Sequence, residues 1–111
     1  MDKIKGDIYF AEKIIQDVEF IMKHTENLSK EEFEVNELLQ DSMMFRLIQI
    51  SEISLRLSDE FKEKYNTIPW FAIKGLRNRI VHDYGNVDLT VVYITITVDI
   101  PEVNRLLQRF R

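Results

Sequence analysis

The chain contains no cysteine in its 111 residues. This absence excludes a disulfide framework, a thiolate zinc site and a catalytic thiol, because each of these needs cysteine sulfur. The two histidines, His24 and His82, are far apart in the sequence and the carboxylates are scattered, so neither a metal site nor a bound cofactor is predicted. A chain without disulfides suits a reducing compartment, and we expect a cytoplasmic location.

Long apolar runs and an excess of basic residues are also missing. No window approaches the roughly 20 apolar residues that span a bilayer, and the N-terminal MDKIKGDIYF interleaves charged with apolar residues, unlike a secretory signal. We therefore expect neither membrane insertion nor export. The formal net charge is −4 and the pI is about 5.2. This balance argues against a nonspecific nucleic-acid coat protein, so any nucleic-acid contact would need a local basic patch.

The chain has three glycines and two prolines, with no repeat, low-complexity tract or flexible linker. With so few residues that break helices, the sequence suits a few long helices joined by short loops. The length and the 45% apolar content predict one domain over residues 1–111 with a modest core. We expect an all-α, up-and-down bundle of four to five helices. Because a small domain leaves much of its surface exposed, a homodimer would be a ready way to gain stability.

Apolar residues at steps of three and four predict the first helices. The first helix covers residues 3–24, and His24 at its end is expected to complement the helix dipole. Ser29 with Glu32 three residues later forms a capping-box pattern for a short helical segment. A long helix is then predicted over about residues 36–65.

Pro69 marks the start of the next helix. The proline disfavours helical geometry in the residue before it and is well placed in a first helical turn. The helix is predicted to begin near Trp70 and to run to about Asp83, where Gly85 supplies a left-handed cap.

The last segment, which begins LTVVYITITVDI, gives conflicting signals. Its β-branched residues alternate strictly, and this alone predicts a strand. Across residues 89–110, however, apolar residues step by three or four, and no other segment offers a partner strand. We therefore predict a helix that is interrupted or kinked before Pro101, because that proline disfavours helical geometry at Ile100.

The stretch RNRIVHDYG, which begins at Arg77, carries several chemically active groups. If residues 69–83 are helical, Asn78 and His82 lie nearly one above the other and Arg77 lies one residue round the helix. Tyr84 falls where the helix ends and can fold back towards the same edge. Metal-independent RNA cleavage uses such groups, because imidazole can act as acid or base near neutral pH and guanidinium binds phosphate oxygens in a bidentate way.

A purely structural interpretation of the same residues is open. Cations in the last turn of a helix commonly complement the helix dipole, and Arg77, Arg79 and His82 could do only that. If His82 is catalytic, the dipole favours its imidazolium form, and hence an acid or phosphate-stabilising role. Arg79 points further round the helix and is either solvated or an accessory contact to phosphate in RNA.

The run ISEISLRLSDEF and the later segments IPW, GLRN, VDL and IPEV resemble the HepT-like family of the HEPN superfamily. The signature of that family is arginine, four residues, histidine, one residue and tyrosine. Arg77, His82 and Tyr84 meet this signature, and Asn78 fills the polar position that usually comes after the arginine. The resemblance covers nearly the whole chain.

The resemblance implies a helical homodimer in which two copies of the motif form a composite ribonuclease site. It makes Arg77 and His82 the catalytic pair and Asn78 a helper that orients the histidine or the phosphate. Many family members are toxins encoded beside an MntA-type nucleotidyltransferase antitoxin, which silences them by adding AMP to the motif tyrosine, here Tyr84. The implied partners are a second copy of the chain, RNA and this nucleotidyltransferase.

Neighbouring residues are candidates for supporting roles. Glu52 matches a position that the family usually keeps acidic, and it either pairs with Arg77 across helices or is simply exposed. Ser51 and Ile53 beside it replace the family's usual small residues. Arg46 either points into the cleft, where a basic residue helps to position a phosphate substrate, or lies elsewhere.

Two further expectations concern the aromatic residues and the function. The aromatic residues Trp70, Phe71 and Tyr93 are expected in the core rather than as platforms for stacked bases. A second functional hypothesis is a non-catalytic helical partner that presents Tyr84 to a nucleotidyltransferase. The acidic balance of the chain favours this second hypothesis, whereas the intact catalytic pair favours an endoribonuclease.

Overall fold

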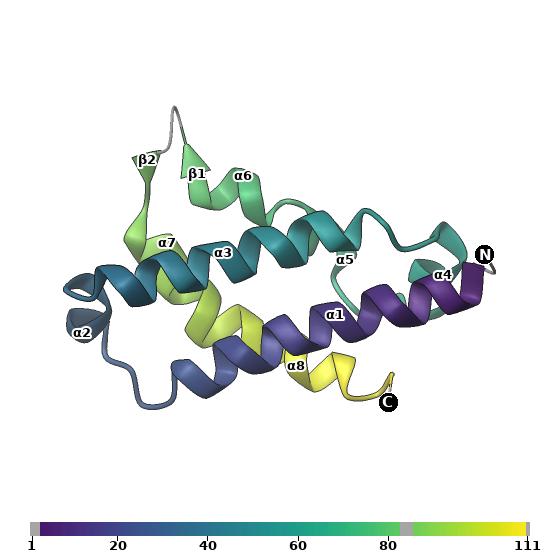
Figure 1. Cartoon of the computed structure of the whole chain (residues 1–111), viewed down its shortest axis with the longest axis horizontal. Coiled ribbons are helices and arrows are strands. Elements are labelled where there is room, and N and C mark those ends of the chain that lie inside the picture. Colours follow the sequence, from purple (N-terminus) through teal and green to yellow (C-terminus); the bar gives the residue numbers. More distant parts are fainter. Residues whose placement is uncertain (1–2, 83–85, 111) are drawn as a thin grey trace.

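The computed structural model describes residues 3–82 and 86–110, and helices dominate this part of the chain (Figure 1). The prediction of an all-α fold is confirmed. No helix in the described ranges is long and apolar enough to cross a membrane. The elements in chain order are α1 (Lys3–His24), α2 (Lys30–Glu34), α3 (Glu37–Ser54), α4 (Asp59–Lys64), α5 (Trp70–Lys74), α6 (Leu76–Ile80), β1 (Val81–His82), β2 (Asn86–Val87), α7 (Leu89–Ile94), the π-helical η1 (Thr95–Asp99) and α8 (Ile100–Leu107).

The consecutive elements α7, η1 and α8 form one continuous C-terminal helix. The core forms where α1, α3 and this C-terminal helix meet. Helices α1 and α3 lie side by side along the long axis, and α7, η1 and α8 together pack against both (Figure 1). Helix α6 contacts α3 and lies on its far side from α1 in this view. The predicted apolar faces supply the fully buried side chains, which include Ile14, Ile15, Val18 and Ile21 of α1, Met43, Leu47 and Ile50 of α3, and Val92, Ile96 and Ile100 of the C-terminal helix.

The long helix predicted over residues 36–65 is instead two helices, so this prediction is wrong. Helix α3 ends at Ser54, and Ser58 begins α4 by accepting a hydrogen bond from the Phe61 N–H at 3.1 Å. The carboxylate of Asp7 on α1, only 6% exposed, accepts bonds from the Ser58 N–H at 2.8 Å and its hydroxyl at 2.6 Å. Because a buried carboxylate requires donors, this tertiary contact stabilises the break.

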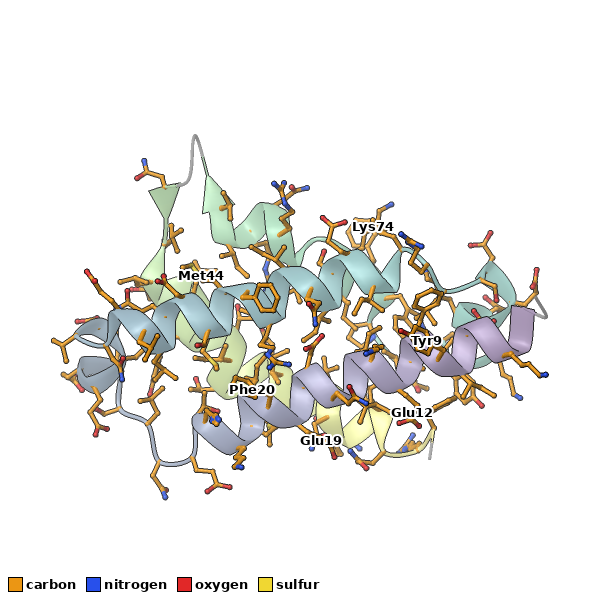
Figure 2. All side chains as sticks on the ribbon, viewed as in Figure 1. Tyr9, Glu12, Glu19, Phe20, Met44 and Lys74 are labelled. Carbon is orange, nitrogen blue, oxygen red and sulfur yellow. The ribbon has the colours of Figure 1, made fainter. Side chains whose placement is uncertain are left out.

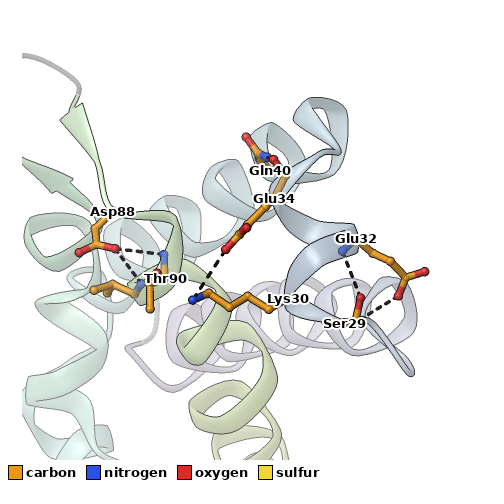
Figure 3. Close-up of polar contacts among 8 residues, drawn as sticks. Ser29, Lys30, Glu32, Glu34, Gln40, Asp88 and Thr90 are labelled. Atoms are coloured by element: carbon orange, nitrogen blue, oxygen red, sulfur yellow. Dashed lines mark hydrogen bonds and ion pairs between the residues drawn. The ribbon is translucent and has the colours of Figure 1, made fainter.

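The capping box predicted at Ser29 is confirmed (Figure 3). The Ser29 N–H donates to Glu32 Oε1 at 2.9 Å, and the Glu32 N–H donates to Ser29 Oγ at 3.1 Å. The bond from the Ser29 backbone is the main reason that the pKa of the Glu32 carboxyl lies below its ordinary value. Asp88 caps α7 similarly, accepting from the Thr90 and Val91 N–H groups. Such caps satisfy N–H groups that have no partner within the helix.

The segment after residue 89 is helical through residue 107, which confirms the helix prediction over the strand alternative. The expected loss of helical geometry at Ile100 is wrong, because Ile100 has φ −64° and ψ −42°. The chain instead stays helical and changes to the π-helical η1 before Pro101, and the Ile100 N–H donates to the Thr95 carbonyl five residues back. Pro101 has no N–H and occupies the first turn of α8, where a helix requires none.

The single motif helix predicted over this segment is instead two short helices, α5 and α6, which meet at Gly75. The segment begins at Trp70 as predicted, but α6 ends at Ile80 rather than near Asp83. Val81 adopts an extended backbone, with φ −103° and ψ 114°, and pairs with Val87 in an antiparallel ladder. Both valines pack against the core, and β-branched residues favour extended backbone. The last turn of the predicted helix is therefore replaced by a strand pair.

Candidate functional site

A surface hollow of about 330 Å³ lies where the C-terminal part of α3 meets α5 and α6. It contains three of the predicted site residues, namely Glu52, Arg77 and Asn78. The structure therefore gathers side chains from two distant parts of the sequence into one depression. The other residues that line it are Ser51, Leu55, Phe71, Lys74 and Gly75.

Ser51 joins α3 to the segment that carries the motif. Its side chain is buried, and its hydroxyl donates to the carbonyl of Lys74, the last residue of α5, at 2.7 Å. Helix α6 starts two residues later and buries Leu76 and Ile80 against the core. The Ser51 hydroxyl therefore adds a hydrogen bond between α3 and α5.

The Arg77 guanidinium faces Glu52, with its Nε 4.0 Å from Oε1. The contact agrees with the first alternative for Glu52, a pair with Arg77, and the exposed fractions of 56% for Arg77 and 60% for Glu52 agree with the second as well. A pair of this kind contributes at most about 1 kcal/mol of stability. Glu52 can therefore orient Arg77 without preventing it from binding an anion.

Arg79 lies on another side of α6. Its Nη2 donates to Thr95 Oγ1 and to Asp99 Oδ2, both at 3.2 Å. It lines a separate and largely apolar hollow of about 380 Å³ beside the C-terminal helix. The structure thus does not bring Arg79 to Arg77, and the contacts of Arg79 connect α6 to η1.

His82 is the second residue of β1, the strand that follows α6, and its backbone pairs with Asn86. The prediction that Asn78 and His82 lie one above the other on a helix is wrong, because α6 ends two residues before His82. The helix-dipole argument for the charged form of His82 is lost with it, since that effect falls off within the last turn. Tyr84 and the predicted cap at Gly85 lie outside the described residues.

Arg46 lies on the side of α3 that faces α1 and does not line the hollow beside Arg77. Its Nη1 is 2.8 Å from Asp17 Oδ1, and its guanidinium carbon lies 3.9 Å from the centre of the Phe20 ring. Figure 2 shows Phe20 between α1 and α3, with Lys74 beyond α3. Asp17 is 1% exposed and accepts two further bonds from Gln49. Because removing one partner of a buried ion pair costs about 3–5 kcal/mol, these contacts give Arg46 a structural role.

Of the three aromatic residues expected in the core, two pack against it and one is exposed. Trp70 and Tyr93 pack against the core as predicted. The structure adds that Trp70 donates to the Tyr65 carbonyl at 3.2 Å and Tyr93 to the Leu28 carbonyl at 2.8 Å. Phe71 is 91% exposed, so its assignment to the core is wrong. Helix α5 has the sequence WFAIK, in which apolar residues occupy nearly every position. Periodicity therefore could not identify its buried face.

Lys74 is a residue of the hollow that the motif did not identify. It stands three residues before Arg77, and this helical spacing is the sequence signal that links the two cations. The hollow thus offers two cations, the Asn78 amide and one carboxylate, and guanidinium and ammonium groups form strong hydrogen bonds with phosphate. In residues 3–82 and 86–110, no three histidine, aspartate or glutamate side chains gather as they would around a metal ion.

Comparison with known proteins identifies the family. Residues 14–110 match the family described as Ribonuclease HepT-like. A protein of Caldanaerobacter subterraneus subsp. tengcongensis named "Putative RNase" is 31% identical over 96 residues, which cover 86% of each chain. The "Probable ribonuclease HepT" of Thermococcus cleftensis is 28% identical over 102 residues, or 92% of this chain and 93% of that protein. No solved structure matches. With the match extending over both the helical core and the Arg77 motif, the chain belongs to the ribonuclease HepT-like family.

Proposed function

We propose that this chain is a metal-independent endoribonuclease that acts as a homodimer and serves as the toxin of a type VII-like toxin–antitoxin module. The observation that carries the proposal is the exposed pair of Arg77 and Asn78 in one hollow, with His82 close behind in the chain, in a member of a ribonuclease family. The arginine and histidine of the motif supply the groups that RNA cleavage needs, and the tyrosine supplies the hydroxyl that would accept AMP.

In the proposed reaction the RNA 2′-oxygen attacks the adjacent phosphorus while a base takes its proton, and the 5′-oxygen leaves with a proton from an acid. His82 acts as acid or base. Arg77, oriented by Glu52, stabilises the negative charge that grows on the nonbridging oxygens, and Asn78 orients His82 or the phosphate. Because each chain has a single His82, a mechanism that uses one histidine as base and another as acid would require a second copy of the chain.

The purified chain is expected to cleave RNA in excess EDTA, because no step of this mechanism uses a metal ion. The measurement is gel-resolved cleavage of a single-stranded RNA, with analysis of the new ends for 2′,3′-cyclic phosphate. Expression without an antitoxin should also arrest growth. His82→Ala, prepared identically, controls for contaminating nucleases. A folded wild-type chain that leaves RNA intact would contradict the proposal and favour the non-catalytic partner, which the net charge of −4 also favours.

The proposal includes an MntA-type nucleotidyltransferase that adds AMP to Tyr84. The phenolic oxygen would lose its proton, attack the α-phosphorus of ATP and release pyrophosphate, and the added phosphate would pair with Arg77. After co-expression with such an enzyme, the intact mass is expected to rise by whole AMP units. Tyr84→Phe should abolish the increase, because it removes the accepting oxygen. The same increase in Tyr84→Phe would exclude this tyrosine as the acceptor.

A further inference from the structure

Phe71 is the most exposed large apolar side chain in the described part of the chain, at 91%. It stands second in α5, directly after Trp70, whose side chain packs against the core. Leaving a phenylalanine ring in water forgoes the free energy of its burial. An exposed ring on a helix that is otherwise anchored therefore points to a ligand or a partner.

The ring lines the same hollow as Arg77, Asn78 and Lys74. Leu55, which is 52% exposed, adds a second apolar side chain to the wall. The hollow thus places an apolar, aromatic surface beside two cations and an amide. A nucleotide has two parts that match these surfaces, because its base stacks on aromatic rings and its phosphate binds guanidinium.

A protein partner is the competing occupant for such a ring. The buried centre of a protein interface is depleted in charged residues. Here Arg77 and Glu52 line the same hollow, and both are more than half exposed. A protein that covered them would remove water from both charges, which is costly. An RNA phosphate would bind the exposed Arg77 guanidinium directly, so the charges around Phe71 favour RNA.

We propose that Phe71 is a stacking platform for an unpaired RNA base next to the phosphate that Arg77 binds. This inference rests on the proposed ribonuclease function and narrows its substrate to single-stranded or looped RNA, since a base inside a duplex is already stacked. Stacking tolerates all four bases. Phe71 therefore confers a preference for unpaired structure rather than for sequence.

Three substitutions at position 71 separate stacking from simple apolar contact. Phe71→Trp keeps an aromatic face, Phe71→Leu keeps apolar bulk without one, and Phe71→Ala removes both. The probe is a single-stranded RNA that carries 2-aminopurine, whose fluorescence falls on stacking, and 2′-O-methyl groups, which prevent cleavage. The wild type and Phe71→Trp should quench the probe. Phe71→Leu and Phe71→Ala should bind it about 5- to 150-fold more weakly, the range for loss of one base–aromatic stack.

Phe45→Ala is the matched control. Phe45 is also exposed, at 60%, but it lines a separate hollow with Phe20 and Arg46, so RNA binding should not change. Equal quenching by the wild type and Phe71→Ala would overturn the proposal, as would undiminished binding by Phe71→Leu. Sedimentation identifies the alternative, because a lower mass for Phe71→Ala with unchanged RNA binding assigns the ring to a protein contact.

Failure of the ribonuclease proposal is a distinguishable result. The wild type could quench the uncleavable probe through Phe71 but leave ordinary RNA intact in EDTA. This result would contradict the ribonuclease proposal and leave the proposed stacking role of Phe71 standing. If the wild type and Phe71→Ala cleave RNA with the same KM, the ribonuclease proposal stands and the proposed stacking role of Phe71 is contradicted.

Discussion

An Arg77→Ala variant is expected to cleave RNA about 10²–10³-fold more slowly than the wild type, the usual cost of removing one preorganised donor to a developing oxyanion. The guanidinium can give two parallel hydrogen bonds to phosphate oxygens. These bonds strengthen as charge accumulates in the transition state, so the loss should appear in the chemical step. The measurement is the single-turnover rate constant in EDTA at saturating protein, which separates this step from RNA binding.

The loss should be one of catalysis and not of folding. Arg77 is 56% exposed and lies 4.0 Å from an equally accessible Glu52. The free energy of unfolding, measured in urea, should therefore fall by less than about 1 kcal/mol. Arg77→Lys should recover only part of the rate, because an ammonium cannot make the bidentate contact.

Arg105→Ala is the matched control for the loss of one positive charge. Arg105 lies on α8, pairs with Glu102 in an exposed salt bridge and does not line the hollow. It is expected to keep the wild-type rate. If Arg105→Ala slowed cleavage as much as Arg77→Ala, the effect would come from the overall field of the protein, and a specific role for Arg77 would be contradicted.

Local spacing predicted most helices because each buries a face formed by neighbours in sequence. Residues 89–110 illustrate this, since their β-branched composition favours a strand but Ile96 and Ile100 are spaced to enter a helical core, where both are buried. A strand there would have required a partner that the rest of the chain lacks. Tertiary pattern therefore outweighed intrinsic propensity.

The features that sequence reasoning missed depend on partners far away in the chain. The break before Ser58 is held by Asp7, 51 residues earlier, and Arg46 is held by Asp17, 29 residues earlier. The spacing of apolar residues describes one helix or strand at a time, so it cannot predict contacts between residues that are far apart in the sequence. Two buried carboxylates on α1 thus had these effects: Asp7 determined where a neighbouring helix broke, and Asp17 determined where a candidate site residue pointed.

The residue types of the Arg77 motif could be identified from the sequence, but the positions of their side chains could not. Arg77 and Arg79 are two positions apart, which on a helix places them on nearly opposite sides. The structure gives them separate tasks, because Arg79 bonds Thr95 and Asp99 while Arg77 stays open beside Glu52. Together with the bond from Ser51 to the Lys74 carbonyl, the Arg79 contacts hold α6 before substrate arrives. In the proposed mechanism, a fixed α6 limits the movement of the Arg77 backbone, and electrostatic stabilisation of a transition state depends on such preorganisation.

A His82→Ala variant is expected to lose about 10²–10⁴-fold in cleavage rate, the range for a positioned general acid or base. An imidazole changes its charge between about pH 5 and 8. The wild-type rate should therefore vary across this interval, and the residual rate of the variant should vary less. The measurement is the single-turnover rate constant in EDTA at several pH values, with circular dichroism to confirm the fold.

Imidazole added to the buffer tests the proton-transfer role of His82 directly. The His82 backbone pairs with Asn86, so removal of the side chain leaves this ladder in place and the fold should persist. Free imidazole can then enter the vacated space and transfer protons in His82→Ala, but it cannot replace the guanidinium in Arg77→Ala. Partial recovery is therefore expected for the first variant and none for the second. A His82→Ala variant that kept the wild-type rate would leave Arg77 without an acid–base partner and would contradict the mechanism.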